Sequence, residues 1–417
     1  MDKKRRLSDV DGDGDRDTVT PARRAVNSVN SSSAVRVVLV EPFYGGSHKQ
    51  LIDLLVKELL ADVPHAVCSL APRKWHWRLM AASLSLSSTI PCSDALRVLF
   101  VTSMVNLAEL LGLRPDLNVP SIRKIYYFHE NQLTYPYQTP ATAADGSDAV
   151  APRKVAAEDF HIGWSQVLSC LAADELVFNS DFNRQSFLSR VEAFINKIPE
   201  QELRLHGLRA RLERKSKVLY FPLVVPPPVS EPASDSPAAD RLTIVWNHRW
   251  EYDKNPDEFF QTLFELDDAG CKFNVVVLGE SFGESPHVFQ QAKERLEASA
   301  NAFLTHWGFA PTRERYFALL RAADVVISTS HHEFYGVAVL EAVLCGCYPL
   351  VPNRLVYPEF FGKDHLFNTQ RQLFKKLKYF CGNPRAARAF RDGKSEAYLR
   401  HTWLHLRSDY DKLLLEQ

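Results

Sequence analysis

Two carboxylates stand eight residues apart in the second half of the sequence, where they are placed to bind hydroxyl groups. Glu333 lies three residues before Gly336, which allows a sharp turn, and Glu341 falls in an apolar run that predicts a helix beginning near residue 337. Ionised carboxylates accept hydrogen bonds from vicinal hydroxyls, so one can hold a sugar and the other a ribose. The alternative is a Glu341 that is solvated on the outer face of its helix.

Two cations, Arg249 and Lys254, follow the strand predicted at residues 242–246. Ligands of open α/β sheets bind at the carboxyl ends of strands, and two neighbouring cations at such an end suit a diphosphate. The alternative is a solvated loop with scattered charge. Because no Asp-x-Asp metal motif lies at a predicted strand end, we expect electrostatic catalysis by these cations, with no metal and no cofactor.

Adjacent glycines, Gly45 and Gly46, join the strand predicted at 35–40 to the helix predicted at 48–60. Glycines at such a turn let the backbone approach a ligand closely, and the free N–H groups of the helix start attract an anion. The pair therefore suits a phosphate, and a plain tight turn explains it equally well.

Polar residues also follow two other strands predicted in the first half. His129 comes after the strand at 124–128, so we expect it at the carboxyl ends of the strands, facing the cleft. The alternative is a histidine that packs among its aromatic neighbours. Glu130 either fixes the tautomer of that imidazole or is an exposed loop carboxylate. Asn179 and Ser180 either line the acceptor side of a cleft or cap a helix.

The segment at residues 204–217 is strongly basic and includes Arg209 and Arg211. It holds six Lys or Arg residues against one Glu, which suits contact with an RNA backbone. On the charge run alone, a solvated helix face is the preferred explanation.

Short β-branched runs alternate with amphipathic stretches from residue 35 onward, a pattern typical of βα units around parallel sheets. The alternation stops at a Pro-, Ser- and Ala-rich stretch and then restarts, so we predict an α/β protein of two doubly wound, Rossmann-like domains facing a cleft. The predicted strands are 35–40, 96–102, 124–128, 175–178, 217–221, 242–246, 273–278, 302–306, 325–329 and 348–351. The predicted divisions are a disordered tail (1–34), a first domain (35–222), a linker (223–240), a second domain (241–383) and C-terminal helices that cross back (384–417).

The composition excludes several classes of protein. Apolar residues make up 46% and charged residues 24% of the 417 residues, which argues against collagenous, coiled-coil and wholly disordered chains. The 50 basic and 50 acidic residues balance, so any surface that binds a polyanion must be a local patch.

The sequence predicts a chain without a membrane span or a secretion signal. The stretch closest to a span, at residues 95–113, is interrupted by Arg97, Asn106 and Glu109, and the N-terminus is basic and polar. The seven cysteines are odd in number and contain no C-x-x-C pair, which favours reduced thiols. We therefore expect a cytoplasmic protein; residues 3–6 are either a nuclear address or ordinary tail charge.

The spacing of Glu333 and Glu341, with Arg249 and Lys254 upstream, resembles the retaining GT-B glycosyltransferases that use a nucleotide sugar, across roughly residues 35–410. The resemblance implies that Glu333 contacts the donor sugar and Glu341 the ribose, while the two cations contact the diphosphate. It also implies that the first domain serves the acceptor and the second holds the nucleotide sugar. Retention then follows either attack on the face that the diphosphate leaves or a covalent carboxylate intermediate.

Three longer strings narrow this resemblance. Residues 41–48, 128–136 and 178–183 are similar to the tRNA-queuosine mannosyltransferase family. That family's activity implies GDP-mannose as the donor, queuosine in tRNA-Asp as the acceptor, and a His129 close to the transferred sugar. The implied partners are therefore tRNA and a nucleotide sugar.

Two other functions stay open. A lipid- or glycan-directed glycosyltransferase predicts an exposed basic, amphipathic helix in the first domain, and the sequence shows no convincing helix of that type. A nucleotide-sugar-binding protein without turnover is favoured if Glu333, Arg249 or Lys254 is missing, and all three are present.

Overall fold

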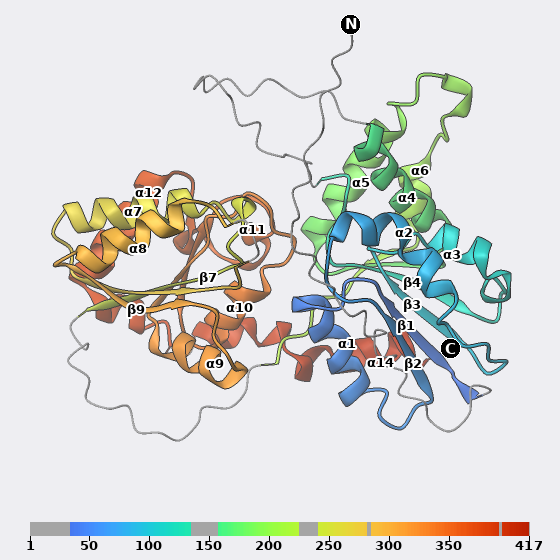
Figure 1. Cartoon of the computed structure of the whole chain (residues 1–417), viewed down its shortest axis with the longest axis horizontal. Helices are drawn as coiled ribbons and strands as arrows, with labels where there is room; N and C mark the ends of the chain where they lie inside the picture. The colour runs from blue at the N-terminus through green and yellow to red at the C-terminus, as the bar shows by residue number, and fades with distance from the viewer. Residues whose placement is uncertain (1–33, 135–156, 225–240, 282–284, 392–393, 417) are drawn as a thin grey trace, which may run out of the picture.

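The described parts of the chain form two lobes, each built on one parallel sheet (Figure 1). The computed structural model describes residues 34–134, 157–224, 241–281, 285–391 and 394–416. The predicted disordered tail, apart from Ala34, and most of the predicted linker lie outside these residues.

The first lobe contains six parallel strands in the order β2-β1-β3-β4-β5-β6. They are β1 (Val37–Glu41), β2 (His65–Ser69), β3 (Val98–Thr102), β4 (Arg123–Phe128), β5 (Glu175–Phe178) and β6 (Ser216–Val218). The helices are α1 (Gly46–Glu58), α2 (Trp75–Ser87), α3 (Leu107–Leu113), α4 (Ala157–Ala172), α5 (Asp181–Ile195) and α6 (Leu208–Glu213). β1 and β3 are buried along their whole length because β-branched and aromatic residues fill both faces. The strand order reverses between them, which is where such sheets bind ligands.

Two elements of this lobe are hidden from sequence patterns. β2 begins with His65 and ends with Ser69, so its apolar part is only three residues long. α2 shows no clear helical period because Trp77, Met80 and Leu84 are exposed while its other face is buried.

The second lobe contains six strands in the order β12-β11-β10-β7-β8-β9, and all neighbours are parallel. They are β7 (Leu242–Asn247), β8 (Phe273–Leu278), β9 (Ala302–Gly308), β10 (Val325–Ile327), β11 (Tyr348–Pro352) and β12 (Leu366–Phe367). The helices are α7 (Pro256–Asp268), α8 (Val288–Ala298), α9 (Arg313–Ala322), α10 (Val337–Leu344), α11 (Tyr357–Phe360), α12 (Gln370–Gly382) and α13 (Pro384–Arg388). The order reverses between β7 and β10, so the prediction of two doubly wound α/β sheets is confirmed.

The end of the chain packs on the first lobe. α14 (Trp403–Leu414) is drawn at the first lobe, on the side where the two lobes meet (Figure 1). The hydroxyl of the buried Tyr410 lies 3.2 Å from that of Tyr127 and donates a hydrogen bond to the carbonyl of Tyr220 at 3.0 Å. The core of the first lobe therefore includes the last helix.

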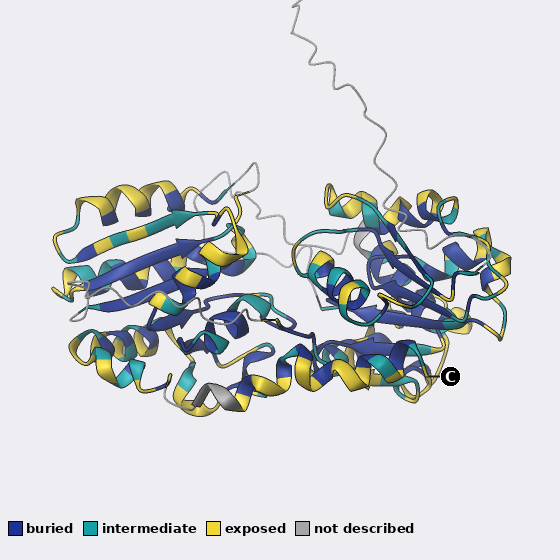
Figure 2. Cartoon of the chain, turned by 90° about the horizontal axis from the view of Figure 1, so that it is seen from below, coloured by how far each residue is buried: buried dark blue, intermediate teal, exposed yellow. Residues whose placement is uncertain are grey.

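Buried residues continue from one lobe into the other. Leu39 and Tyr127 of the first lobe belong to the same hydrophobic cluster as Val245 and Tyr335 of the second. The hydroxyl of Tyr335 also donates a hydrogen bond to the carbonyl of Phe221 at 2.8 Å. Figure 2 shows the general pattern, in which buried strands lie inside each lobe and exposed residues lie on the outer helices.

Polar contacts at the start of α5 also join the lobes. The hydroxyl of Ser180 donates to the carbonyl of Phe334 at 2.7 Å. The carboxylate of Glu359, on α11, accepts the backbone N–H groups of Asp181 and Phe182 at 3.0 and 2.8 Å. A helix N-terminus of one lobe is thus neutralised by a carboxylate of the other.

None of the described helices is both long and apolar enough to cross a bilayer. The longest of them, α4, has 16 residues, whereas a span needs about 20. This finding agrees with the prediction that the chain has no membrane span.

Replacing Tyr410 by alanine should lower the free energy of unfolding by about 3–5 kcal/mol, because a large buried ring leaves a cavity. Chemical denaturation followed by circular dichroism measures the change. Leu404→Ala alters an 83% exposed residue of the same helix and should change this free energy by less than about 0.5 kcal/mol. Equal effects of the two variants would contradict the packing of α14 into the core.

Candidate active site

Two loops of the second lobe meet where its strand order reverses. One follows β7 and carries Arg249 and Lys254, and the other follows β10 and carries Glu333. β7 and β10 are paired in the sheet, so the loops leave from adjacent carboxyl ends. The backbone N–H of His331 donates to the carbonyl of Asp253 at 2.8 Å and ties the two loops together.

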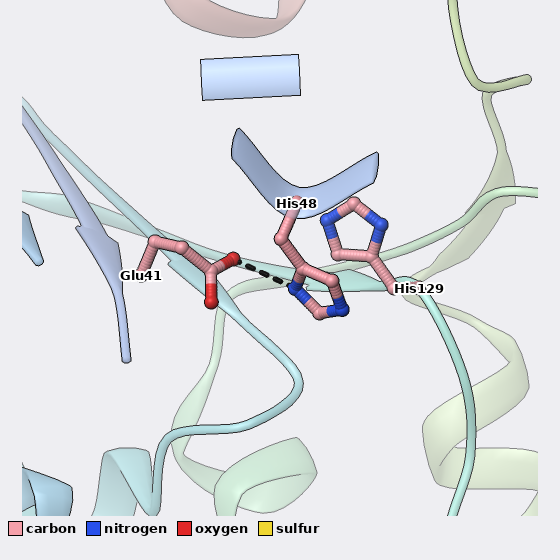
Figure 3. A group of neighbouring side chains, drawn as sticks. All are labelled: Glu41, His48 and His129. Carbon is pink, nitrogen blue, oxygen red and sulfur yellow. Dashed lines mark hydrogen bonds and ion pairs between the residues drawn. The ribbon is translucent and has the colours of Figure 1, made fainter. Parts of the chain in front are cut away.

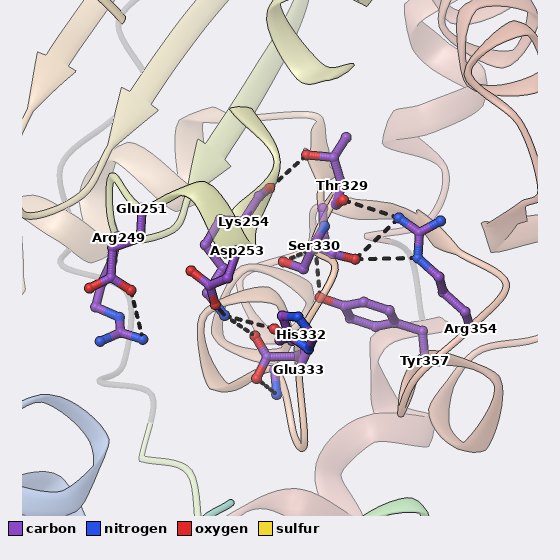
Figure 4. Close-up of polar contacts among 12 residues, drawn as sticks. Arg249, Glu251, Asp253, Lys254, Thr329, Ser330, His332, Glu333, Arg354 and Tyr357 are labelled. Atoms are coloured by element: carbon purple, nitrogen blue, oxygen red, sulfur yellow. Dashed lines mark hydrogen bonds and ion pairs between the residues drawn. The ribbon is translucent and has the colours of Figure 1, made fainter. Parts of the chain in front are cut away.

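Lys254 is a buried cation held by two carboxylates (Figure 4). Its Nζ lies 3.1 Å from Asp253 Oδ2 and 3.3 Å from Glu333 Oε2. It also donates to the carbonyl of His332 at 2.9 Å. Burial disfavours the ammonium, but the charges of Asp253 and Glu333 together outweigh burial and raise the pKa of Lys254 above its ordinary value. Lys254 is therefore charged at neutral pH.

Glu333 is held in one orientation from two sides. Its Oε1 accepts the N–H of Gly336 at 3.0 Å, while its Oε2 faces Lys254. Gly336 has a φ of 82°, a left-handed conformation that glycine adopts readily, and so makes the predicted turn. Burial opposes ionisation of Glu333, but the charge and hydrogen bond of Lys254, together with the interaction with His248, outweigh burial and hold the pKa of Glu333 below its ordinary value. The ionised carboxylate can accept hydrogen bonds from ligand hydroxyls.

Glu341 lies inside α10, as predicted, and is only 3% exposed, so the alternative of a solvated residue is wrong. Its Oε1 accepts hydrogen bonds from Arg313 Nη2 at 2.8 Å and from Gln50 Nε2 at 3.3 Å. Its Oε2 accepts the hydroxyl of Tyr316 at 2.9 Å. Gln50 belongs to α1, so this carboxylate lies where the lobes meet. Arg313, whose side chain is half exposed, thus occupies one oxygen of this carboxylate.

Arg249 is the exposed member of the predicted cation pair. Its side chain is about half exposed and pairs with Glu251 at 3.1 Å. Arg354 adds a further cation, whose Nη2 donates to the carbonyls of Thr329 and Ser330 at 3.3 Å each. Figure 4 shows Arg249 and Arg354 on opposite sides of the central loops. The two cations thus follow the carboxyl ends of β7 and β11, on either side of the loop after β10, which suits an anionic ligand.

In the first lobe, Glu41 and His48 form a buried ion pair (Figure 3). Glu41 ends β1 and is fully buried, and its Oε2 lies 2.9 Å from His48 Nδ1. On the other side of the ring, Glu130 Oε2 lies 3.6 Å from His48 Nε2. Burial disfavours the imidazolium, but the Glu41 charge and contacts with Glu130 raise the pKa of His48 to about 10. His48 is therefore a cation at neutral pH.

His129 stacks on this cation. The ring centroids of His48 and His129 are 3.9 Å apart, and the rings are tilted by 30°. Burial and the charge of His48 lower the pKa of His129 well below its ordinary value, so His129 is neutral. Its Nε2 is buried and has no hydrogen-bond partner among the described residues. The alternative of a packing histidine explains the ring contact with Tyr127 but leaves this nitrogen unexplained.

Glu41, His48 and His129 are also the one group in the described chain whose ligand atoms are close enough to hold a metal ion. Their contacts fit a hydrogen-bonded ion pair better. Glu41 Oε1 accepts the N–H of Phe43 at 2.7 Å, and Glu41 Oε2 is paired with His48. A protonated imidazole does not bind a metal ion. The expectation that no metal takes part in catalysis stays a prediction.

The glycine pair begins α1. Gly45 is the N-cap in an extended conformation, and Gly46 has a φ of 51°. A Cβ on Gly45 would lie 2.6 Å from the Pro72 ring, so this position has no room for a side chain unless the loop after β2 moves. Close packing therefore explains Gly45, and the role of both glycines toward a phosphate stays a prediction.

Asn179 and Ser180 form hydrogen bonds to the backbone around the site. The hydroxyl of Ser180 accepts the N–H of Asn183 at 3.0 Å, so Ser180 is the N-cap of α5. Asn179 Nδ2 donates to the carbonyl of His129 at 2.8 Å. Both side chains are buried, and their contact with an acceptor stays a prediction.

Arg209 and Arg211 are exposed on α6, which packs against α5. The backbone N–H of Arg209 donates to Glu192 Oε1 at 2.9 Å, but no described contact joins either arginine side chain to the residues around His129. Their contact with RNA stays a prediction.

Several residues of the site are not singled out by the sequence. Gln50, Arg313 and Tyr316 reach Glu341 only through the fold, and no local pattern points to them. Glu41 does leave a signal, because a carboxylate at the end of a wholly apolar strand run requires a buried partner.

Comparisons with known proteins agree with this geometry. Residues 36–223 match the family model for the N-terminal part of tRNA-queuosine alpha-mannosyltransferase, and residues 231–392 match glycosyl transferases group 1. A tRNA-queuosine alpha-mannosyltransferase of Drosophila melanogaster is 43% identical over 368 residues, which cover 87% of this chain and 91% of that protein. The chain belongs to the tRNA-queuosine alpha-mannosyltransferase family. The resemblance inferred from the sequence is confirmed, and the enzyme is a mannosyltransferase.

More distant proteins share parts of this enzyme or its fold. A GDP-mannose-dependent alpha-(1-6)-phosphatidylinositol dimannoside mannosyltransferase of Mycobacterium tuberculosis is 28% identical over 125 residues, 30% of each chain. The structure of a sucrose-phosphate synthase from Thermosynechococcus elongatus has a TM-score of 0.60 at 12% identity and covers 91% of this chain and 98% of that one. A trehalose-6-phosphate synthase structure has a TM-score of 0.61 at 12% identity, covering 92% and 99%. These two likenesses concern the fold alone and confirm the GT-B prediction.

Because His48 is charged in the fold, the free energy of unfolding of this mannosyltransferase should depend on pH. The pKa of His48 is about 10 in the fold against an ordinary 6.5, so its contribution is complete below pH 6.5 and disappears as the pH rises to about 10. Denaturant titrations across this range should show a steeper loss of stability in the wild type than in His48→Gln. The exposed His206, replaced by Gln, is the control and should follow the wild type. A constant gap between wild type and His48→Gln would contradict a charged His48.

Proposed function

We propose that this enzyme transfers mannose from GDP-mannose to queuosine in tRNA-Asp with retention of configuration. The observation that carries the proposal is the 43% identity, over 87% of the chain, to the Drosophila melanogaster protein named for the queuosine reaction. The enzyme would meet its tRNA in the cytoplasm, with the nucleus as a second compartment.

The donor binds mainly to the second lobe in this proposal. Arg249 and Lys254 contact the diphosphate, Glu333 accepts hydrogen bonds from mannose hydroxyls, and Glu341 accepts them from the ribose. The buried contacts of Lys254 and Glu333 support these roles, because both groups are charged and oriented before the donor arrives.

The acceptor enters from the first lobe, and His129 lies beside the transferred sugar. In front-face transfer, the bond between the sugar's anomeric carbon and the diphosphate oxygen breaks as the acceptor oxygen forms its bond to that carbon. The proton of the acceptor hydroxyl goes to the departing phosphate oxygen, and the nearby cations stabilise the negative charge that develops there. A covalent carboxylate intermediate is the other route to retention.

One observation favours a lipid acceptor as the second candidate. The sequence shows no convincing basic, amphipathic helix in the first lobe, but in the structure α2 exposes Trp77, Met80 and Leu84 behind the exposed Arg73 and Lys74. Arg73 and Lys74 precede the helix, and Arg78 is the only Lys or Arg within it, so the expectation that the lobe lacks a basic, amphipathic helix stays a prediction. The apolar period is masked in the sequence because α2 is apolar on two faces.

Incubation with radiolabelled GDP-mannose distinguishes the acceptors. We expect label on tRNA-Asp that bears queuosine, and none on the same tRNA with guanosine at that position or on a lipid extract. Label in the lipid extract alone would overturn the proposed function, and label on both tRNAs would overturn the choice of queuosine.

Arg249→Ala should lower kcat by about 10²-fold, because it removes one donor from the charge that develops on the diphosphate. Steady-state kinetics measure it, and Lys272→Ala is the matched control, since Lys272 is exposed just before β8, at the opposite edge of the same sheet. Unchanged turnover in Arg249→Ala would remove this residue from the donor site. Lys254→Ala should lower turnover strongly, but it leaves two largely buried carboxylates without their cation and should cost about 3–5 kcal/mol of stability.

A further inference from the structure

The helix α2 exposes an apolar face that the proposed transfer of mannose to tRNA does not use. Trp77, Met80 and Leu84 are 64%, 37% and 64% exposed, and their spacing of three and four residues places them on one side of the helix. The other side, with Leu79 and Leu86, is buried in the first lobe. On a globular domain, an apolar face with polar surroundings marks a binding surface.

Cations flank the exposed tryptophan. Arg73 and Lys74 are exposed directly before the helix, and neither forms an ion pair with a described residue. Lys74 has a φ of 48°, which is uncommon for a residue other than glycine, and is the N-cap of α2. Arg78 directly follows Trp77. Cations interleaved with aromatic rings are typical of proteins that bind single-stranded nucleic acid.

This basic, aromatic segment lies beside the active site. The backbone N–H of Tyr44 donates to the carbonyl of Leu70 at 3.0 Å, which joins the loop before α1 to the loop before α2. Trp75 and Phe43 pack on the same small apolar cluster. Phe43 donates its N–H to Glu41, the carboxylate that holds His48. The start of α2 is therefore at the carboxyl edge of the first sheet, where the acceptor enters.

We propose that Arg73, Lys74 and Trp77, called here the α2 platform, bind unpaired nucleotides next to the acceptor nucleotide of the RNA substrate. Trp77 stacks on a base, and the two cations contact backbone phosphates. An enzyme reaches a base only when that base is unpaired, and unpaired neighbours offer their faces to an aromatic ring. This inference rests on the proposed function, because it takes the acceptor to be RNA.

The distribution of charge on α2 favours RNA over a lipid surface. A helix that lies on a membrane carries cations along its polar flanks. The cations of α2 are confined to its beginning, at Arg73, Lys74 and Arg78, whereas Ser85 and Ser88 are exposed at its end. The charged end is also the end next to the active site.

The basic segment around Arg209 and Arg211 is the competing RNA surface. It contains no Phe, Tyr or Trp between residues 204 and 217, so it can follow phosphates but cannot stack on a base with such a ring. The two surfaces therefore predict different responses to the loss of one aromatic residue.

Equilibrium binding of a labelled tRNA-Asp transcript without queuosine tests the platform independently of mannose transfer. Trp77→Ala should raise the Kd about 10-fold or more, as expected for the loss of one stacked base. Trp77→Phe keeps a ring and should stay close to wild type, whereas Trp77→Leu keeps apolar area only and should behave like Trp77→Ala. Tyr379→Ala, which removes a 59% exposed ring on α12, is the matched control and should leave the Kd unchanged.

Salt dependence tests the cations. Replacing both Arg73 and Lys74 by Ala should reduce the slope of log Kd against log salt concentration by about 1 to 2, because up to two phosphate contacts are lost. Replacing both Arg209 and Arg211 by Ala is the comparison. A slope that falls only in the second variant would overturn the platform.

Two further results would overturn it. One is an equal Kd for wild type and Trp77→Ala. The other is a wild type that binds vesicles of phosphatidylcholine and phosphatidylserine but no tRNA, with vesicle binding retained in Trp77→Leu. A different result would contradict the proposed function. In that case the wild type would place no labelled mannose on queuosine-bearing tRNA, whatever effect Trp77→Ala has on tRNA binding.

Discussion

The cation of Lys254, removed from water between Asp253 and Glu333, is the interaction on which the donor side of the active site depends. A buried ammonium is costly unless carboxylates and a carbonyl surround it, so the loops after β7 and β10 must meet in one arrangement. The same arrangement directs Glu333 to the N–H of Gly336. Charge that develops on a departing diphosphate therefore meets groups that are already oriented.

The first lobe also holds a buried ion pair at the active site. There Glu41 is buried and His48 is its cation, and the neutral His129 stacks on the charged ring. Burial and the charge of the neighbouring His48 keep His129 unprotonated at physiological pH. The two lobes thus differ in charge at the candidate active site, with a buried ammonium in the second lobe and a neutral imidazole over a charged one in the first.

Sequence patterns predict the parts of this structure whose physics is local. β4 and β8 are predictable because each contains four consecutive apolar residues, and short apolar runs buried on both faces are typical of parallel sheets. α2 is not, because Trp77 and its exposed neighbours erase the helical period. In the active site, Lys254 and Glu333 stand out by their distance from strand ends. Gln50 and Arg313 do not, since they reach Glu341 only once two lobes and two distant helices have come together.

The packing of the chain's end on the first lobe has a consequence for synthesis. Domains commonly fold in the order in which they leave the ribosome. Tyr410 and Leu413 belong to the hydrophobic cluster that the two lobes share, and Tyr410 contacts Tyr127 and Tyr220 of the first lobe, so that lobe lacks part of its interior until residue 413 has been translated. The second lobe's own core cluster extends no further than Ala387. The half of the enzyme that is made first therefore stays incomplete until α14 has been made.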